Sequence, residues 1–306
     1  MWPWEIGLEN YTSLFRLYKE QPAASVFAHF YPPKRDDAPP DFDAPFKAIA
    51  NATLDGFESW TFQQERFRRK HSSSEVPKLK NYLNYTFVRL VLLELQSPGD
   101  HFLVTVDDDW ICFNTGLQNP FGADLLAVFQ RFKPKPDGGR PTEGFPGRVY
   151  KGLWTPTDRR YRELFGAKIP KLAWYSKESR DFVFDTSYTL DREAFDHLLE
   201  RARERAGLPN ASDEGIRNYL RGSIENLVPK IARNYKVAIP VYYVEEQRMQ
   251  MLLPFISASD PNDVSCFLVE RNDAHKCYIL KTIFDLDQAY FSARLITRPD
   301  RDWLNP

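Results

Sequence analysis

The sequence predicts an α+β fold in which a largely antiparallel sheet is flanked by helices. Two observations carry this prediction: runs with apolar residues at helical spacing lead the chain, and short strand-like runs follow one another towards its end before a closing helix. We expect one main domain, residues 46–306, after an N-terminal helical extension and Pro-rich connection, residues 1–45. No internal repeat is visible in the sequence.

The composition restricts the class of function. The 306 residues are enough for a full core, and 42% hydrophobic with 15% aromatic residues indicate an ordered globular chain. The formal net charge of -1 excludes the broad basic field of a protein that coats duplex DNA. Any contact with nucleic acid must therefore be local.

Cysteines and hydropathy restrict the location. Cys112, Cys266 and Cys277 lie far apart in apolar runs, which predicts buried free thiols. No charged and then apolar leader opens the chain, and no window holds the eighteen or so apolar residues that span a bilayer. We therefore expect a cytoplasmic protein with no membrane partner.

The first half of the chain predicts helices and then a hairpin. Residues 1–30 have the apolar spacing of an opening helix, and the Pro-rich segment 31–45 is an exposed connection. A strong helix is expected over 79–95. Strands are expected over 102–106, 110–113 and 125–132, the first two joined as a hairpin through Asp107-Asp108-Asp109.

Helix 79–95 has a second stripe beside its apolar face. Asn81, Tyr85 and Arg89 recur at every fourth residue, on either the solvent side or the wall of a cleft. Tyr beside Arg is a frequent stacking and phosphate pair and also a common surface pair. Tyr85 and Arg89 are therefore candidate substrate-binding residues.

Two polar segments adjoin the predicted hairpin. Asp107–Asp109 suits either a metal site or a solvated turn. Adjacent carboxylates point apart, and no His or Glu is near in sequence to complete a ligand set. The turn is therefore favoured, and no metal site is expected. Asn114, Thr115 and Gly116 offer an amide, a hydroxyl and close backbone approach at one point. They suit a phosphate or base edge, or a loop that satisfies its own backbone.

The middle of the chain predicts a mobile loop and then helices. The basic, Gly- and Pro-rich residues 133–147 suit a lid over an anion or a loop that is only mobile. Residues 181–185 resemble a strand, and 192–205 an amphipathic helix. A long helix from Ser212, interrupted or bent at Pro229, ends in Arg233-Asn234-Tyr235-Lys236. These cations either complement the helix dipole or flank a site.

Strands are next expected over 237–243, 249–256 and 264–269, and the stretch 276–303 closes the chain as a strand feeding a helix. Asp285 is the predicted N-cap, with Gln288 at the capping-box spacing. The polar residues on or beside this element are Lys281, Asp287, Tyr290, Arg294 and Arg298. Their position on a core-anchored element favours a phosphate-handling site.

Four segments of the sequence form a recognisable set. They are Tyr82–Leu90, Phe113-Asn114-Thr115-Gly116-Leu117, Arg233–Lys236 running on to Tyr242-Tyr243 and Leu252-Leu253-Pro254, and Leu286–Tyr290 with Ala293–Ile296, Arg298-Pro299-Asp300 and Trp303-Leu304. In order and spacing they resemble a bacterial family, the domain of unknown function 3825. This family is often joined to small RNA-binding modules of the LOTUS type, which implies work on RNA or nucleotides. Phe291-Ser292 and Val241 depart from the polar residues expected there, which implies a different specificity.

The leading hypothesis is metal-independent cleavage of a ribonucleotide phosphodiester, in RNA or in a small linear or cyclic oligoribonucleotide such as cyclic oligoadenylate, as in ring nucleases. Preorganised cations would stabilise the charge on phosphorus, and the substrate's own 2′-OH would attack. The candidate catalytic residues are Lys236, Arg233, Lys281, Arg294 and Tyr290. The candidate substrate-binding residues are Asn114, Thr115, Tyr85, Arg89, Asn234, Tyr235, Asp287 and Arg298.

Two other classes remain open. A non-catalytic RNA- or nucleotide-binding module would use every one of these residues, and none of the five histidines falls in a matched motif to act as a base. A protein-interaction scaffold explains the aromatic residues but not the polar residues at strand ends. We expect no cofactor and no metal, a ribonucleotide ligand, and a homodimer as the assembly.

Overall fold

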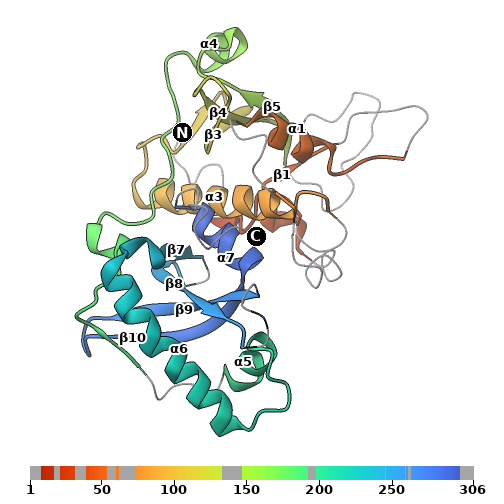
Figure 1. Ribbon diagram of the computed structural model, residues 1–306. Helices are drawn as coiled ribbons and strands as arrows, with labels where there is room; N and C mark the ends of the chain where they lie inside the picture. The colour runs from red at the N-terminus through yellow and green to blue at the C-terminus, as the bar shows by residue number, and fades with distance from the viewer. Residues whose placement is uncertain are drawn as a thin grey trace. The chain divides into compact units, whose positions relative to one another are not determined.

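The computed structural model describes residues 8–16, 21–31, 39–53, 60–61, 74–132, 147–191, 198–244, 246–258, 260 and 263–296. These residues form six α-helices and two five-stranded sheets (Figure 1), which confirms the predicted α+β class. The chain divides into two compact units. Unit 1 comprises residues 1–62 and 70–173, and unit 2 comprises residues 63–69 and 174–306.

The sheet of unit 1 has the strand order β1-β5-β4-β3-β2. The short strand β1 pairs parallel with β5, and the other neighbours are antiparallel. The strands are β1 (Ala28–His29), β2 (Leu103–Val106), β3 (Trp110–Gln118), β4 (Asp124–Arg131) and β5 (Arg148–Trp154). The predicted hairpin is confirmed, and Asp107–Asp109 forms its turn.

Helices cover both faces of this sheet. Helix α3 (Pro77–Gln96) confirms the helix predicted over 79–95, and its Phe87 ring lies 4.6 Å from the ring of Phe27 and 5.6 Å from that of Phe113. On the other face, helix α4 (Arg159–Phe165) packs Tyr161 and Phe165 into a cluster with sheet residues. The sheet residues of this cluster are Val104, Cys112, Leu126, Val128 and Trp154. Helix α1 (Ala44–Ala52) spans the position where the N-terminal extension was predicted to end.

The sheet of unit 2 has the strand order β6-β10-β9-β8-β7. The short strand β6 pairs parallel with β10, and the rest of the sheet is antiparallel. The strands are β6 (Thr189–Leu190), β7 (Ile239–Tyr243), β8 (Arg248–Ile256), β9 (Val264–Asn272) and β10 (Cys277–Asp285). The last four correspond to the strands that the sequence predicts.

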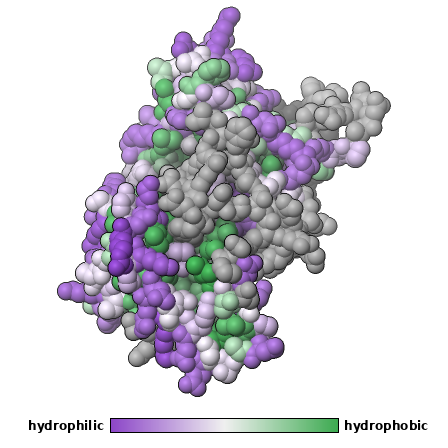
Figure 2. All heavy atoms as spheres, viewed as in Figure 1, coloured by the Kyte–Doolittle hydropathy of each residue, from purple (hydrophilic) through white to green (hydrophobic). Residues whose placement is uncertain are grey.

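Alternate residues of these strands pack on opposite sides, as the pleat requires. Leu253 and Phe267 join a cluster with helices α5 (Leu199–Arg205) and α6 (Asp213–Arg233), whereas Leu252 and Leu268 join a cluster with helix α7 (Leu286–Arg294). The predicted apolar face of α6 is buried, namely Ile216, Leu220, Ile224, Leu227 and Ile231. Its outer surface is mostly hydrophilic (Figure 2), so α6 is amphipathic.

The two units have the same topology, although the sequence shows no repeat. In each, a two-residue strand is followed by helices and then by a four-stranded antiparallel meander, whose last strand lies parallel to the two-residue strand. A further helix follows the meander in both units, α4 in unit 1 and α7 in unit 2.

Three segments differ from the sequence predictions. In place of an opening helix, residues 8–16 and 21–31 form 3₁₀ turns, a bridge between Ser13 and Val26, and β1, because Phe27 is buried against the sheet. The strand predicted over 181–185 is wrong: Ser179–Phe182 forms the 3₁₀ turn η4. The helix predicted over 192–205 is observed as α5, with residues 192–197 outside the described residues.

Candidate functional site

The turn between α6 and β7 carries the predicted Arg233-Asn234-Tyr235-Lys236 segment. Helix α6 ends at Arg233, whose Nη1 donates to the carbonyl oxygen of Pro229 at 2.9 Å. The side-chain oxygen of Asn234 accepts from the backbone N–H of Lys236 at 3.1 Å and caps the 3₁₀ turn η6 (Tyr235–Val237). Tyr235 is 66% exposed. A fixed turn therefore presents an aromatic ring between two basic residues.

Helix α7 places its predicted site residues differently. Asp285 is the N-cap, as predicted, and its Oδ1 accepts from the backbone N–H of Gln288 at 3.0 Å. Tyr290 is 7% exposed and packs beneath the sheet with Ala289 and Ala293. Asp287 is fully buried. Tyr290 is therefore buried, whereas the side chain of Tyr235 is largely exposed to solvent.

Arg294 and Arg298 complete the predicted set on this element. Arg294 lies half-buried in the last turn of α7, where a cation complements the helix dipole. Arg298 lies outside the described residues.

Lys281 belongs to an ion-pair cluster on β8, β9 and β10. Its Nζ lies 3.4 Å from Oε1 of Glu246 and 3.2 Å from Oε2 of Glu270. Arg248 also pairs with Glu270, and Gln250 Nε2 lies 3.3 Å from Glu270 Oε2. Two carboxylates therefore balance the two cations, and a phosphate near Lys281 has to compete with both glutamates.

The pKa of Glu270 reflects this balance. Burial raises it, but hydrogen bonds and charge from Arg248 and Lys281 outweigh burial, so the pKa lies below its ordinary value. Glu270 is thus held as a carboxylate at neutral pH.

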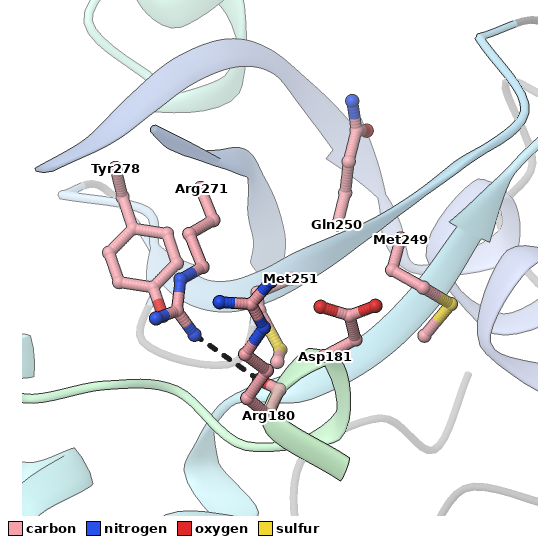
Figure 3. A pocket seen from close by; sticks show the side chains of 7 residues that line it. All are labelled: Arg180, Asp181, Met249, Gln250, Met251, Arg271 and Tyr278. Atoms are coloured by element: carbon pink, nitrogen blue, oxygen red, sulfur yellow. Dashed lines mark hydrogen bonds between the residues drawn. The ribbon is translucent and has the colours of Figure 1, made fainter. Parts of the chain in front are cut away.

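The face of the unit 2 sheet that η4 crosses contains a pocket with about 240 Å³ of empty space, part of it open to solvent (Figure 3). Its lining residues are Arg180, Asp181, Met249, Gln250, Met251, Arg271 and Tyr278. Tyr278 and the two methionines supply apolar surface, and the guanidinium of Arg180 lies at the pocket with its side chain 59% exposed. The space within it that is open to a water-sized group is about 20 Å³, enough for one or two water molecules, so the pocket is a small surface hollow.

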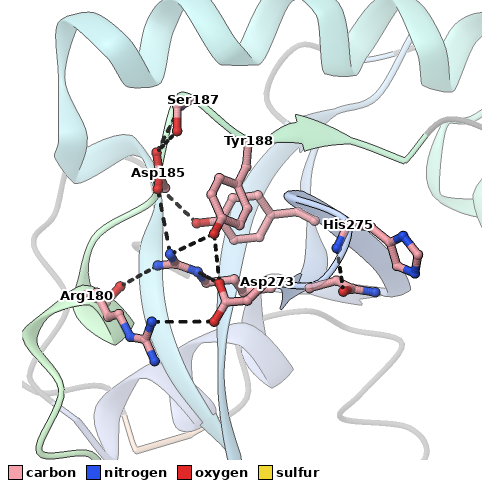
Figure 4. A network of polar contacts seen from close by, with 9 residues as sticks. Arg180, Asp185, Ser187, Tyr188, Asp273 and His275 are labelled. Carbon is pink, nitrogen blue, oxygen red and sulfur yellow. Dashed lines mark hydrogen bonds and ion pairs between the residues drawn. The ribbon is translucent and has the colours of Figure 1, made fainter.

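A network around Arg271 fixes η4 and the following loop to the sheet (Figure 4). Arg271 Nε donates to Asp273 Oδ1 at 2.5 Å and Nη2 donates to the hydroxyl of Tyr188 at 3.2 Å. The hydrogen bond to Tyr188 and those to Asp273 raise the pKa of Arg271, while the bond from Arg271 lowers the pKa of Asp273. Asp185 lies 3.7 Å from Arg271, so the network is close to charge-balanced and its first role is structural.

In unit 1, the polar groups of Asn114 and Thr115 bond to nearby residues. Asn114 Nδ2 donates to Asp124 at 3.0 Å, and its Oδ1 accepts from the backbone N–H of Gly116 at 3.0 Å. Thr115 Oγ1 donates to the carbonyl of Leu125 at 2.6 Å and accepts from the N–H of Leu117 at 3.2 Å. These bonds satisfy polar groups where the β3–β4 ladder is irregular. They fit the second of the two interpretations of this segment, a loop that satisfies its own backbone.

Tyr85 and Arg89 lie one turn apart on α3, where Tyr85 is half-buried and Arg89 is buried. Asn114 belongs to unit 1, whereas the candidate cations Arg233, Lys236, Lys281 and Arg294 belong to unit 2. A single site that includes all of these candidates therefore stays a prediction.

Sequence reasoning missed Arg180, Arg271 and Tyr278. Their one signal is local: Arg271 precedes a polar turn, Asn272–Lys276, which contains Asp273 and lies between two apolar strands. The register of β9 with β10 pairs Arg271 with Tyr278, and η4 adds Arg180, whose carbonyl oxygen accepts from Arg271 Nη1.

Fold and site together define an α+β protein of two like units in which a basic, tyrosine-bearing turn is presented to solvent. The family model of the domain of unknown function DUF3825 matches residues 53–303, so the chain belongs to this family. No curated protein and no solved structure matches the chain. Among the residues described, no helix combines the length and the apolar composition needed to cross a bilayer.

Proposed function

We propose that the protein binds single-stranded ribonucleotide chains, either RNA or a small linear or cyclic oligoribonucleotide, through the turn after α6. The observation that carries the proposal is Tyr235, exposed on a capped turn between Arg233 and Lys236. An aromatic face stacks any base, and flanking cations contact the backbone phosphates. Base stacking of this kind contributes about 1–3 kcal/mol per base.

The contacts around the other candidates favour binding over cleavage. Lys281 is balanced by Glu246 and Glu270, so it does not supply the unpaired charge that a transition state requires. Tyr290 is buried, and the polar groups of Asn114 and Thr115 are occupied within unit 1. Cleavage stays a prediction, tested with the same ligands. The proposal also includes a cytoplasmic location and a homodimer, the latter tested by light scattering.

Binding of labelled linear and cyclic oligoadenylates tests the proposal. Tyr235→Ala is expected to weaken binding at least tenfold, about 1.4 kcal/mol, whereas Tyr235→Phe keeps the stacking face and most of the affinity. Phe121→Ala is the matched control, because it removes a ring that is 93% exposed at the tip of a unit 1 hairpin. Equal affinities of the Tyr235→Ala and Phe121→Ala proteins for every oligoadenylate contradict the proposal.

A further inference from the structure

The ladders between the last two strands of the two sheets match position by position. In each unit, the register between the last two strands shifts once, between β4 and β5 in unit 1 and between β9 and β10 in unit 2. The residue skipped at the shift is Lys151 in unit 1 and Lys281 in unit 2. Each lysine is followed, one residue later, by an aliphatic and an aromatic residue, Leu153-Trp154 and Ile283-Phe284. Lys151 and Lys281 therefore occupy the same point of the same fold.

The following helices extend the match. An aspartate side chain caps each of them, Asp158 for α4 and Asp285 for α7. Each helix packs on the face of its sheet that holds the equivalent strand residues, Val128 in unit 1 and Leu268 in unit 2. The correspondence thus covers the ladder, the bulge and the helix that follows.

The charge near the two lysines differs, because unit 2 has a glutamate where unit 1 has a glutamine. Glu270 of β9 pairs with the residue two positions before Lys281, and the equivalent residue of β4 is Gln130, which pairs with Val149. Lys281 therefore has a carboxylate at 3.2 Å. Lys151 is exposed, and no ion pair joins it to a carboxylate in the part of the chain that the structure describes.

One of the two ladder partners of Gln130 is aromatic. Trp110 pairs with Gln130 from the β3 side, where unit 2 has Gln250, and the rings of Trp110 and Trp154 lie 6.1 Å apart. Asp109 accepts from Gln130 Nε2 at 3.3 Å. The guanidinium of Arg160 lies 5.0 Å from the Trp154 ring, and Asp158 balances its charge at 2.8 Å. Arg160 is thus compensated, whereas Lys151 has no carboxylate partner among the described residues.

We propose that Lys151 and the indole of Trp110 form a second contact for single-stranded ribonucleotide chains, on unit 1. A lysine without a carboxylate partner attracts a backbone phosphate, and a half-buried indole offers a face to a base. The same position in unit 2 is closed to phosphate by Glu270. The inference rests on the proposed function for its ligand class, and it adds a location that the sequence analysis did not contain.

Gln130→Glu tests the proposal by copying the unit 2 arrangement into unit 1. The new carboxylate is expected to pair with Lys151 and to weaken binding of a labelled single-stranded oligoadenylate about fivefold to tenfold at low salt. Lys151→Ala should weaken it to the same extent and lower the salt dependence, as log affinity against log salt, by about 0.7. Gln130→Ala is the matched control, since it also loses the contact to Asp109 but adds no charge; its affinity should stay within about twofold.

Tryptophan fluorescence provides a second readout, which reports on Trp110 directly. Oligoadenylate that stacks on this indole quenches part of the tryptophan emission, and Trp110→Phe should remove that part while Lys151→Ala shifts it to higher ligand concentration. Melting temperatures identify variants that fail to fold.

The outcomes separate this proposal from the first. Equal affinities of the Gln130→Glu and Gln130→Ala proteins overturn the unit 1 contact, even where Tyr235→Ala still weakens binding. Loss of affinity in Lys151→Ala and Gln130→Glu but not in Tyr235→Ala supports the unit 1 contact and overturns the unit 2 one. A wild-type protein that binds no oligoadenylate overturns both.

Discussion

Asp285 and Arg205 form a buried ion pair, with 3.1 Å between Oδ2 of the aspartate and Nη1 of the arginine. The other oxygen of Asp285 caps α7 through the backbone N–H of Gln288. One carboxylate therefore joins α5, the end of β10 and the start of α7. Because the Asp285 side chain has no exposed surface, its charge depends on these partners.

Arg205→Ala is expected to destabilise the protein strongly. It removes the guanidinium that pairs with the buried Asp285 carboxylate, a change that costs about 3–5 kcal/mol in comparable buried pairs. Arg203→Ala is the control, because Arg203 lies on the same helix and pairs with the largely exposed Asp213. An exposed pair of this kind contributes about 1 kcal/mol or less to stability. Urea unfolding of the two variants checks the difference. Similar midpoints would show that the Asp285 pair contributes no more than a surface pair.

Lys281→Met is expected to make the protein more sensitive to acid. The pKa of Glu270 is lowered in the folded state, so its contribution to stability is present above the ordinary glutamate pKa and is lost as pH falls through the folded pKa. Removing Lys281 lets this pKa rise, and the acid-unfolding midpoint should move up by on the order of half a pH unit. Circular dichroism against pH measures it. Lys281→Arg keeps the charge and should unfold at the wild-type pH.

Gly116→Ala tests the backbone of the Asn114–Leu117 segment. Gly116 has a φ of +73°, and a Cβ there would lie 2.6 Å from the hydroxyl oxygen of Tyr82. Gly122→Ala is a matched control, since its φ is +75° but the added carbon meets nothing within 4 Å. Both variants should lose about 1 kcal/mol to the left-handed backbone. Gly116→Ala should lose more, and Tyr82→Phe should restore part of the difference in thermal melting.

Local signals account for the parts of the fold that the sequence predicts. The apolar spacing of α3 and α6, the apolar runs of β8 and β9, and the Asp285 cap each depend on neighbours within a few residues. The division into two sheets depends on pairing between distant strands, and β1 and β6 are each only two residues long. The strand predicted over 181–185 fails because Phe184 stacks on Tyr278, with ring centres 4.1 Å apart.

The candidate site, like the fold, is predictable only where it depends on residues that are close in sequence. The sequence locates the Arg233–Lys236 segment, because a helix end and a polar run are local features. It does not show that Lys281 is balanced, because Glu246 and Glu270 reach it only through the ladder register and the bulge in β10. It also does not separate the buried Tyr290 from the exposed Tyr235, since burial depends on which face of α7 meets the sheet.

The last prediction concerns the triple aspartate and metal ions. Asp107 and Asp108 have φ values of +48° and +57°, so they form the tight turn of the β2–β3 hairpin in a left-handed conformation that aspartate tolerates. In the described part of the chain, no group of three or more His, Cys, Asp or Glu side chains is placed to hold a metal ion. Oligoadenylate binding, and any cleavage, should therefore be the same in EDTA as in manganese. Asp108→Gly should keep both activities and melt at or above the wild-type temperature, because glycine adopts this φ without strain. Cleavage that EDTA abolishes, that manganese restores and that Asp108→Gly lacks would instead make the turn a metal site.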